Sequence, residues 1–128
     1  MSRLRRYDVT ATFAVPDMPI KVCVVPAAPE QVAVLCLNCV RIFDAAGVQL
    51  HHFAADILRS PADIAVRQSS AELLVADETA GVVGFRMRDG TWQMHSQMHM
   101  LGAHSVAPCP DTDCVFVLTR SGAIQCFV

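Results

Sequence analysis

The sequence lacks any long apolar run. No stretch approaches the ~18 uninterrupted apolar residues that a membrane-spanning helix needs, although 53% of the residues are hydrophobic. The early arginines, Arg3, Arg5 and Arg6, are not followed by the apolar segment of a secretion signal. We therefore expect a cytoplasmic protein with no membrane partner.

An excess of charge of one sign is also lacking. Ten basic and twelve acidic residues leave a formal net charge of −2, and the basic residues include a single lysine, Lys21. Such a balance gives no general attraction for nucleic-acid phosphates, so nucleic-acid binding would need a local basic patch. We keep nucleic acid as a possible partner and do not favour it.

Familiar catalytic motifs are missing as well. The chain has no Gly-x-Ser-x-Gly elbow, no phosphate-binding glycine loop and no His-Glu-x-x-His helix. This removes the usual hydrolase, nucleotide-binding and zinc-protease signatures. We therefore expect a protein that is not an enzyme and that holds no cofactor.

What the sequence does contain is an internal repeat. Three phenylalanines, Phe43, Phe85 and Phe127, lie 42 residues apart, and the same spacing relates Pro19, Pro61 and Ala103. Two independent markers with one period indicate a repeat architecture.

Each unit predicts β-strands. It opens with an alternating strand, passes a polar turn into a continuously apolar strand, and continues with a third strand that ends on the repeating phenylalanine. Tight turns at Asp44–Gly47 and Arg88–Gly90 then lead to fourth strands in the first two units. No helix is required. The third unit has no fourth strand of its own, and the alternating segment Tyr7–Phe13 is the candidate to supply it.

Residues 61–90 carry the clearest copy of the repeat. They contain the following four segments: Pro61-Ala62-Asp63-Ile64-Ala65-Val66, Leu74-Val75-Ala76-Asp77-Glu78-Thr79, Val82-Val83-Gly84-Phe85 and Asp89-Gly90. This pattern resembles an NHL repeat, and the resemblance extends over residues 19–128. It implies an all-β chain of three four-stranded antiparallel β-propeller blades of about 42 residues, which is half of a six-bladed propeller.

The expected domain is therefore a single propeller half over residues 1–128. Its parts are an N-terminal arm with the closing strand, 1–18, a first blade, 19–60, a second blade, 61–102, and a third blade, 103–128 together with 7–13.

Three blades do not close a ring, because propellers have roughly four to eight. Unclosed ends would expose strand edges and an apolar face, which natural proteins avoid. We therefore expect a homodimer in which the N-terminal strand closes its own or its partner's third blade. The alternative is a fragment or short relative of a longer propeller.

The resemblance also suggests functions. NHL propellers mostly bind proteins or RNA on one face, and related six-bladed propellers include sugar-lactone hydrolases with a central metal. We expect a non-catalytic scaffold that binds a protein. The alternatives are an RNA-binding module and a divalent-metal-dependent lactonase, in which Asn38, Asp77 and Glu78 of two chains would surround the channel.

The usual ligand face of such a blade carries the loops between the second and third strands and the connections to the next blade. Ten polar residues are expected there: Asp17, Asn38, Asp56, Arg59, Asp77, Glu78, Ser96, His99, Arg120 and Ser121. We expect the partner contacts to come from five of them: Arg59, Asp77, Glu78, His99 and Arg120.

Two other clusters of chemistry-bearing residues occur. Met94, His95, Met98 and His99 offer thioether and imidazole groups that would suit Cu(I), but their spacing matches no established site and they also suit a strand followed by apolar filler. The segment Cys36-Leu37-Asn38-Cys39 has the spacing of a zinc or redox motif without a second ligand pair or a helix N-terminus.

We therefore interpret the cysteines as mostly buried, reduced thiols. Cys109 and Cys114 flank a turn, which would bring them close enough for a disulfide.

Overall fold

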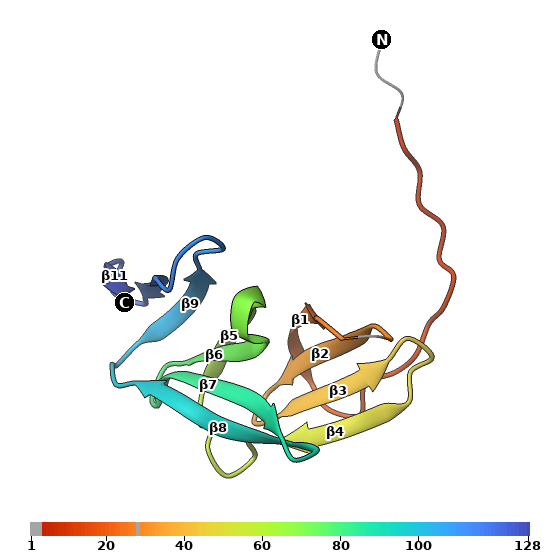
Figure 1. Ribbon diagram of the computed structural model, residues 1–128, viewed down its shortest axis with the longest axis horizontal. Helices are drawn as coiled ribbons and strands as arrows, with labels where there is room; N and C mark the ends of the chain where they lie inside the picture. Colours follow the sequence, from red (N-terminus) through yellow and green to blue (C-terminus); the bar gives the residue numbers. More distant parts are fainter. Residues whose placement is uncertain (1–3, 28) are drawn as a thin grey trace.

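The computed structural model describes residues 4–27 and 29–128. Within these ranges the chain is all-β, with eleven strands in three antiparallel sheets and a single 3-10 turn at Gln68–Ser70 (Figure 1). The described part of the chain has no helix of the length and apolar character that crossing a membrane requires.

The strands run as follows: β1 Pro19–Val25, β2 Gln31–Cys36, β3 Val40–Asp44, β4 Gln49–Phe53, β5 Pro61–Arg67, β6 Glu72–Asp77, β7 Gly81–Arg88, β8 Thr91–Met98, β9 Ala103–Pro108, β10 Val115–Thr119 and β11 Ile124–Phe127.

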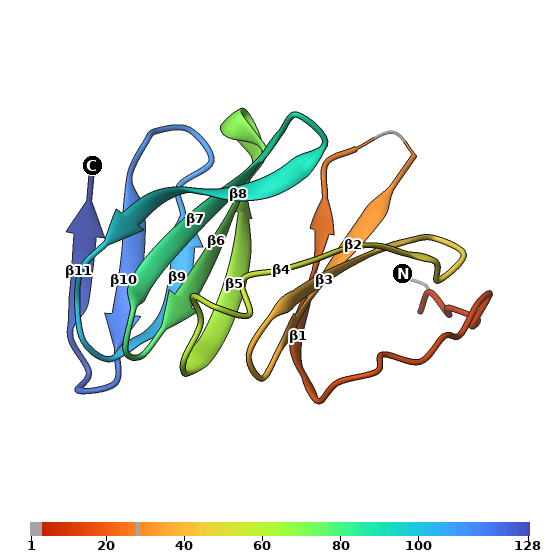
Figure 2. The ribbon, with the colours of Figure 1, turned by 90° about the horizontal axis from the view of Figure 1, so that it is seen from below.

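Every sheet is a simple meander. The first sheet has the order β1-β2-β3-β4, the second β5-β6-β7-β8 and the third β9-β10-β11. The sheets follow one another along an arc, with β1, β5 and β9 on its inner side and β4 and β8 on its outer side (Figure 1). The first and third sheets occupy the two ends of this arc (Figure 2).

The repeat predicted from the sequence is confirmed as a repeat of strands. Pro19, Pro61 and Ala103 begin β1, β5 and β9, and the three repeating phenylalanines lie in β3, β7 and β11. The expected tight turns also form. Asp44 accepts hydrogen bonds from the backbone of Ala46 and Val48 at 2.9 Å, and Gly47 adopts a φ of +89°.

Apolar side chains join the first sheet to the second. Leu35 and Ile42 on one sheet pack with Ile64, Val75 and Val83 on the other, and all five are fully buried. On the outer side of this interface the packing continues with three aromatic residues, Phe53, Phe85 and Trp92. The rings of Phe53 and Trp92 are stacked, with centroids 5.5 Å apart.

A second apolar layer joins the second sheet to the third. Leu74, Ala76 and Val82 of the second sheet pack against Val115 and Val117 of β10, all of them buried. The second sheet is thus covered on both faces, and every residue of β6 is buried. Continuous apolar runs are typical of such doubly covered strands.

The N-terminal segment corrects one expectation. Tyr7–Phe13 forms no strand and does not join the third sheet of its own chain, which lies at the opposite end of the arc (Figure 1). Phe13 instead packs on Phe43 with ring centroids 5.5 Å apart, over Gly47, where the absence of a Cβ makes room. Distance along the arc, rather than strand pattern, prevents the closure within one chain.

Asp77 ties the connection between the sheets to the β6–β7 turn. Its Oδ2 accepts hydrogen bonds from the backbone N–H groups of Arg59 and Ser60 at 2.8 and 2.9 Å. Its Oδ1 accepts those of Thr79 and Ala80 at 2.9 and 2.8 Å. One buried carboxylate therefore satisfies four backbone donors.

Replacing Asp77 by alanine should lower the free energy of unfolding by about 3 kcal/mol, because four backbone donors lose a charged acceptor. Urea unfolding followed by Trp92 fluorescence, at fixed protein concentration, measures the change. Asp56→Ala is the matched control, since Asp56 is exposed, and it should change stability by less than about 0.5 kcal/mol. Equal effects of the two substitutions would contradict the assignment.

Candidate functional site

Three of the predicted contact residues lie on one loop face, defined as the end of the sheets that carries the β2–β3, β6–β7 and β10–β11 turns. A chain of backbone hydrogen bonds orders it: Glu78 N–H donates to Ser60, Gly102 N–H to Glu78, and Arg120 N–H to Gly102, at 2.8–2.9 Å. The Arg120 guanidinium donates to Glu78 Oε1. Arg59, Glu78 and Arg120 are therefore held on neighbouring connections.

Glu78 contacts two basic side chains on this face, Arg120 and His104. Besides Arg120, the Nδ1 atom of His104 lies 3.6 Å from Glu78 Oε1. Arg120 keeps a largely exposed side chain, at 67% of its maximal area. Exposed pairs of this kind contribute little to stability.

Asp77 does not belong to the exposed surface. Its exposed fraction is 0%, and its carboxylate is used by the four backbone donors described above. Its role is therefore to shape the loop face. The same bonds remove it from the ligand set that the lactonase alternative needs, whereas Asn38 is exposed on its turn.

The methionine and histidine string divides into two groups. Met98 and Met100 pack against the apolar layer between the second and third sheets, while Met94, His95 and His99 are exposed. In the described ranges, His99 and its neighbours form no cluster of His, Cys, Asp or Glu ligand atoms. His99 lies on the connection from β8 to β9, beside the loop face.

A polar row on the inner strands was missed from the sequence. Lys21, Asp63 and Ser105 occupy equivalent positions on β1, β5 and β9. Asp63 is buried, and it accepts hydrogen bonds from Lys21 Nζ at 2.5 Å, Ser105 Oγ at 3.1 Å and the backbone N–H of Val106 at 2.9 Å. Their common spacing of 42 residues was the signal that could have revealed them.

The two ends of the arc expose apolar faces. On the first sheet an open apolar hollow is lined by Phe13, Val15, Pro19, Ile20, Lys21, Val22, Val32 and Val34. On the third sheet a second hollow is lined by Ser105, Ala107, Phe116, Leu118 and Ile124. We call these the β1 end face and the β10 end face.

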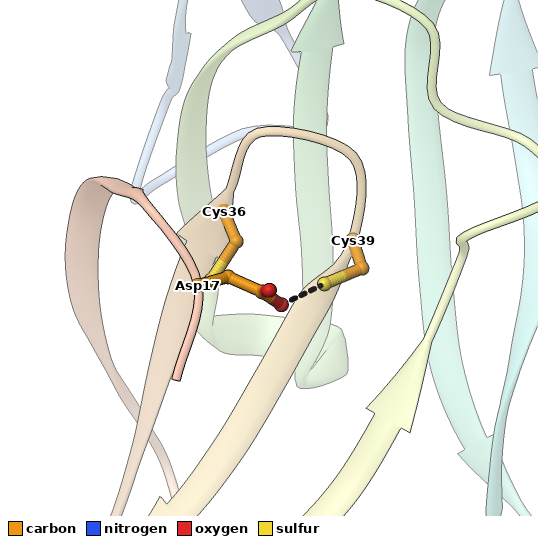
Figure 3. Close-up of side chains that lie close together, drawn as sticks. All are labelled: Asp17, Cys36 and Cys39. Atoms are coloured by element: carbon orange, nitrogen blue, oxygen red, sulfur yellow. Dashed lines mark hydrogen bonds between the residues drawn. The ribbon is translucent and has the colours of Figure 1, made fainter. Parts of the chain in front are cut away.

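The two cysteines of the Cys-x-x-Cys motif lie beside the carboxylate of Asp17. One ligand atom each of Asp17, Cys36 and Cys39 lie within 4.8 Å of one another, and the thiol of Cys39 donates to Asp17 Oδ2 at 3.5 Å (Figure 3). Arg41 also donates to this oxygen, through Nε at 2.8 Å, and this hydrogen bond lowers the pKa of Asp17. Both cysteines are buried, as expected.

All six cysteines are free thiols, so Cys109 and Cys114 form no disulfide. Their turn is closed by a backbone hydrogen bond from Cys109 to Cys114 at 2.9 Å. Burial raises the pKa of the Cys23 and Cys39 thiols to about 11. Hydrogen bonding by Thr112 lowers the pKa of the Cys109 thiol below its ordinary value of 9.0.

Comparisons with known proteins add no relationship. No protein-family model matches the chain, and no curated protein or solved structure shows significant similarity to it.

The thiols should differ in reactivity. Because the thiolate is the nucleophile, iodoacetamide at about pH 8 should alkylate Cys109 at least about tenfold faster than Cys23. A time course analysed by peptide mass spectrometry measures both rates. Thr112→Val should slow the labelling of Cys109, whereas Thr91→Val, at another exposed threonine, should not. Equal rates for the two cysteines would refute this ranking.

Proposed function

We propose that the chain is half of a six-bladed β-propeller, that two copies close the ring, and that the ring is a non-catalytic scaffold whose loop face binds a protein. In this proposal each of the three sheets is a blade. The meander order, the repeat and the position of each first strand on the inner side of the arc all support it.

The end faces provide the main support for pairing. By strand register, Val22 and Val34 of the β1 end face correspond to Ile64 and Val75, which are buried against the neighbouring sheet. On the β10 end face, Leu118 corresponds in the same way to the buried Ala76. Each end face thus repeats one half of an interface that the chain already builds inside itself, so a second copy supplies the missing half at both ends.

The polar inner row fits the same arrangement. Asp63 bonds to Lys21 on one side and to Ser105 on the other. In a closed ring, Ser105 of one copy would lie beside Lys21 of the next, where its hydroxyl can accept a hydrogen bond from the ammonium group. The row would then run around the whole channel.

The N-terminal arm has a role in this assembly. Residues 7–11 precede β4, Gln49–Phe53, by one repeat of 42 residues, so they occupy the place of a fourth strand in the blade before the first. In a two-fold ring that blade is the third blade of the partner. The arm leads away from its own third sheet (Figure 1), which favours exchange of this strand between copies.

The loop face is the proposed protein-binding surface. Arg59, Glu78, His99 and Arg120 would appear twice around the ring, on connections that rigid blades hold in place. Arginine is enriched among residues that dominate protein interfaces, and Arg120 is both exposed and positioned by Glu78. The formal charge of −2 supports a protein in preference to RNA.

The assembly is tested by the solution mass. Sedimentation equilibrium should give twice the chain mass of 13.9 kDa. Val22→Asp and Leu118→Asp should each raise the dissociation constant by at least about a hundredfold, because each places a charge in an apolar interface. Leu101→Asp, at an exposed leucine of a connection, should leave the dimer intact. A wild-type mass equal to one chain would overturn the proposal.

Mixing the two variants gives a sharper test. A dimer of one Val22→Asp chain and one Leu118→Asp chain keeps one undamaged interface, because both substitutions fall in the other. The mixture should therefore form more dimer than either variant alone. Amide exchange in residues 8–12 should also be slower in the wild-type dimer than in the Leu118→Asp monomer.

Binding is tested with variants of the loop face. A partner protein is first recovered by cross-linking to the dimer. Arg59→Ala and Arg120→Ala should each lower the affinity for this partner by about tenfold or more. Arg88→Ala, at the last residue of β7 and at the far end of the sheet, should have no effect. Recovery of RNA with a steep salt dependence would favour the RNA-binding alternative.

A further inference from the structure

The residue that ends the second strand differs between the three sheets. Cys36, Asp77 and Thr119 end the second strands and pair with the first residues of β1, β5 and β9. Asp77 binds four backbone donors, and Thr119 Oγ1 accepts the backbone N–H of Ala123 at 3.0 Å. The Cys36 thiol makes a long contact, 3.9 Å from its sulfur to the carbonyl oxygen of Val34. At this position the first sheet therefore lacks the strong side-chain hydrogen bond that the other two have, although the backbone N–H groups of Cys36 and Leu37 donate to Cys39 and Met18.

Other polar side chains lie close to this position, where the side-chain hydrogen bond is missing. The segment before β1 contributes Asp17, and the residue before β3 contributes Cys39. Together with Cys36, these side chains converge from three points of the chain (Figure 3). The two thiols are buried, while the Asp17 side chain keeps 37% of its area exposed. Cysteine thiolates and aspartate carboxylates are both ligands that divalent zinc accepts in proteins.

We propose that Asp17, Cys36 and Cys39 form a binding site for Zn²⁺ or a similar thiophilic divalent ion. The observed separation supports this assignment. With Zn–S of about 2.3 Å and Zn–O of about 2.1 Å at a tetrahedral angle, sulfur and oxygen lie about 3.6 Å apart. Cys39 Sγ and Asp17 Oδ2 are 3.5 Å apart. A metal ion can therefore take the place of the thiol proton without moving these two ligands far.

The charge around the site also balances. Two thiolates and one carboxylate exceed the charge of a divalent ion by one, and the Arg41 guanidinium, 2.6 Å from Asp17 Oδ2, offsets the difference. Ligating carboxylates are commonly held by such an outer hydrogen bond. His52 lies opposite Arg41 in the register of β3 and β4, on the neighbouring strand. The two thiol protons pass to solvent on binding, and water can fill a fourth position on the exposed side of Asp17.

The consequence for the fold is specific. A metal ion here would fasten the segment before β1 to the β2–β3 turn. Asp77 makes the equivalent connection in the second sheet, where it joins Arg59 and Ser60 to the β6–β7 turn by hydrogen bonds. In the first sheet, metal–ligand bonds would therefore do what the hydrogen bonds of Asp77 do in the second sheet. They would lie close to where the N-terminal arm leaves the first sheet.

Cobalt titration tests the site on the full chain, after reduction and removal of metals. Co²⁺ should bind at one ion per chain, with a thiolate-to-cobalt charge-transfer band and the intense visible bands of tetrahedral coordination. Added Zn²⁺ should displace it. Binding of Co²⁺ without a thiolate band would overturn the proposal, as would the absence of Co²⁺ binding to the fully reduced chain under anaerobic conditions.

Variants assign the ligands. Cys36→Ser and Cys39→Ser should each abolish the charge-transfer band, and Asp17→Asn should weaken Co²⁺ binding by about tenfold or more while the chain stays folded by circular dichroism. The matched control is the Cys109→Ser, Cys114→Ser double variant, which removes the other turn-flanking pair and should leave the band unchanged. Loss of the band in the control alone would place the metal elsewhere and refute the site.

The metal site and the proposed ring are tested separately. All three ligands belong to one chain, so the Leu118→Asp monomer should bind Co²⁺ with unchanged stoichiometry. If that monomer binds no metal while the wild-type dimer does, the ligand set assigned here is wrong.

Discussion

Burial of the sheets on both faces is the constraint on which the rest of the structure depends. A sheet with apolar residues on both faces is stable only when both are covered, because each exposed apolar side chain forgoes roughly 1.5–3 kcal/mol of burial. The second sheet meets this condition, since every residue of β6 is buried. The first and third sheets meet it on one face each, and their other faces expose side chains such as Val22 and Leu118. The same pattern that builds the fold thus creates its interaction surfaces.

Polar groups are placed where the apolar layers end. On the inner side of the arc Asp63 joins β1, β5 and β9, and at the loop face Asp77 and Glu78 organise the connections. Buried carboxylates are tolerated only when donors surround them. Asp63 therefore links the inner strands of all three sheets, and Asp77 holds the connection before β5 against the β6–β7 turn.

Much of this could be predicted from the sequence, since the periodic markers act through local structure. A phenylalanine or proline that recurs every 42 residues reports the same strand position each time, and Asp44 and Gly47 specify their turn by chemistry within the turn itself. The all-β fold, the strand order along the chain and the burial of Cys36 and Cys39 were therefore accessible. The expectation that most thiols are buried was wrong, because three of the other cysteines are half-buried and Cys126 is exposed. The family resemblance had no counterpart in the comparisons, so it stays a prediction.

Long-range arrangement was less accessible. The role of Asp77 depends on Arg59 and Ser60, far from it in sequence, and its charge suggested a surface residue. The segment Tyr7–Phe13 alternates like a strand, but a strand forms only where an edge is within reach, and in one chain the third sheet is not. The carboxylate beside Cys39 escaped notice because Asp17 is separated from it by the whole of β1 and β2.

The position that ends each second strand shows how a repeat can gain specific chemistry without changing its fold. The backbone there requires something to hold the turn, and a carboxylate, a hydroxyl and a thiol occupy it in the three sheets. The carboxylate and the hydroxyl are good acceptors for backbone donors, whereas sulfur is a weak one. The β2–β3 turn is accordingly closed by the backbone hydrogen bond from Cys36 to Cys39, without help from the Cys36 side chain. The adjacent Cys39 and Asp17 are groups that a metal ion can join to it, so the departure from the repeat marks the place where chemistry is expected.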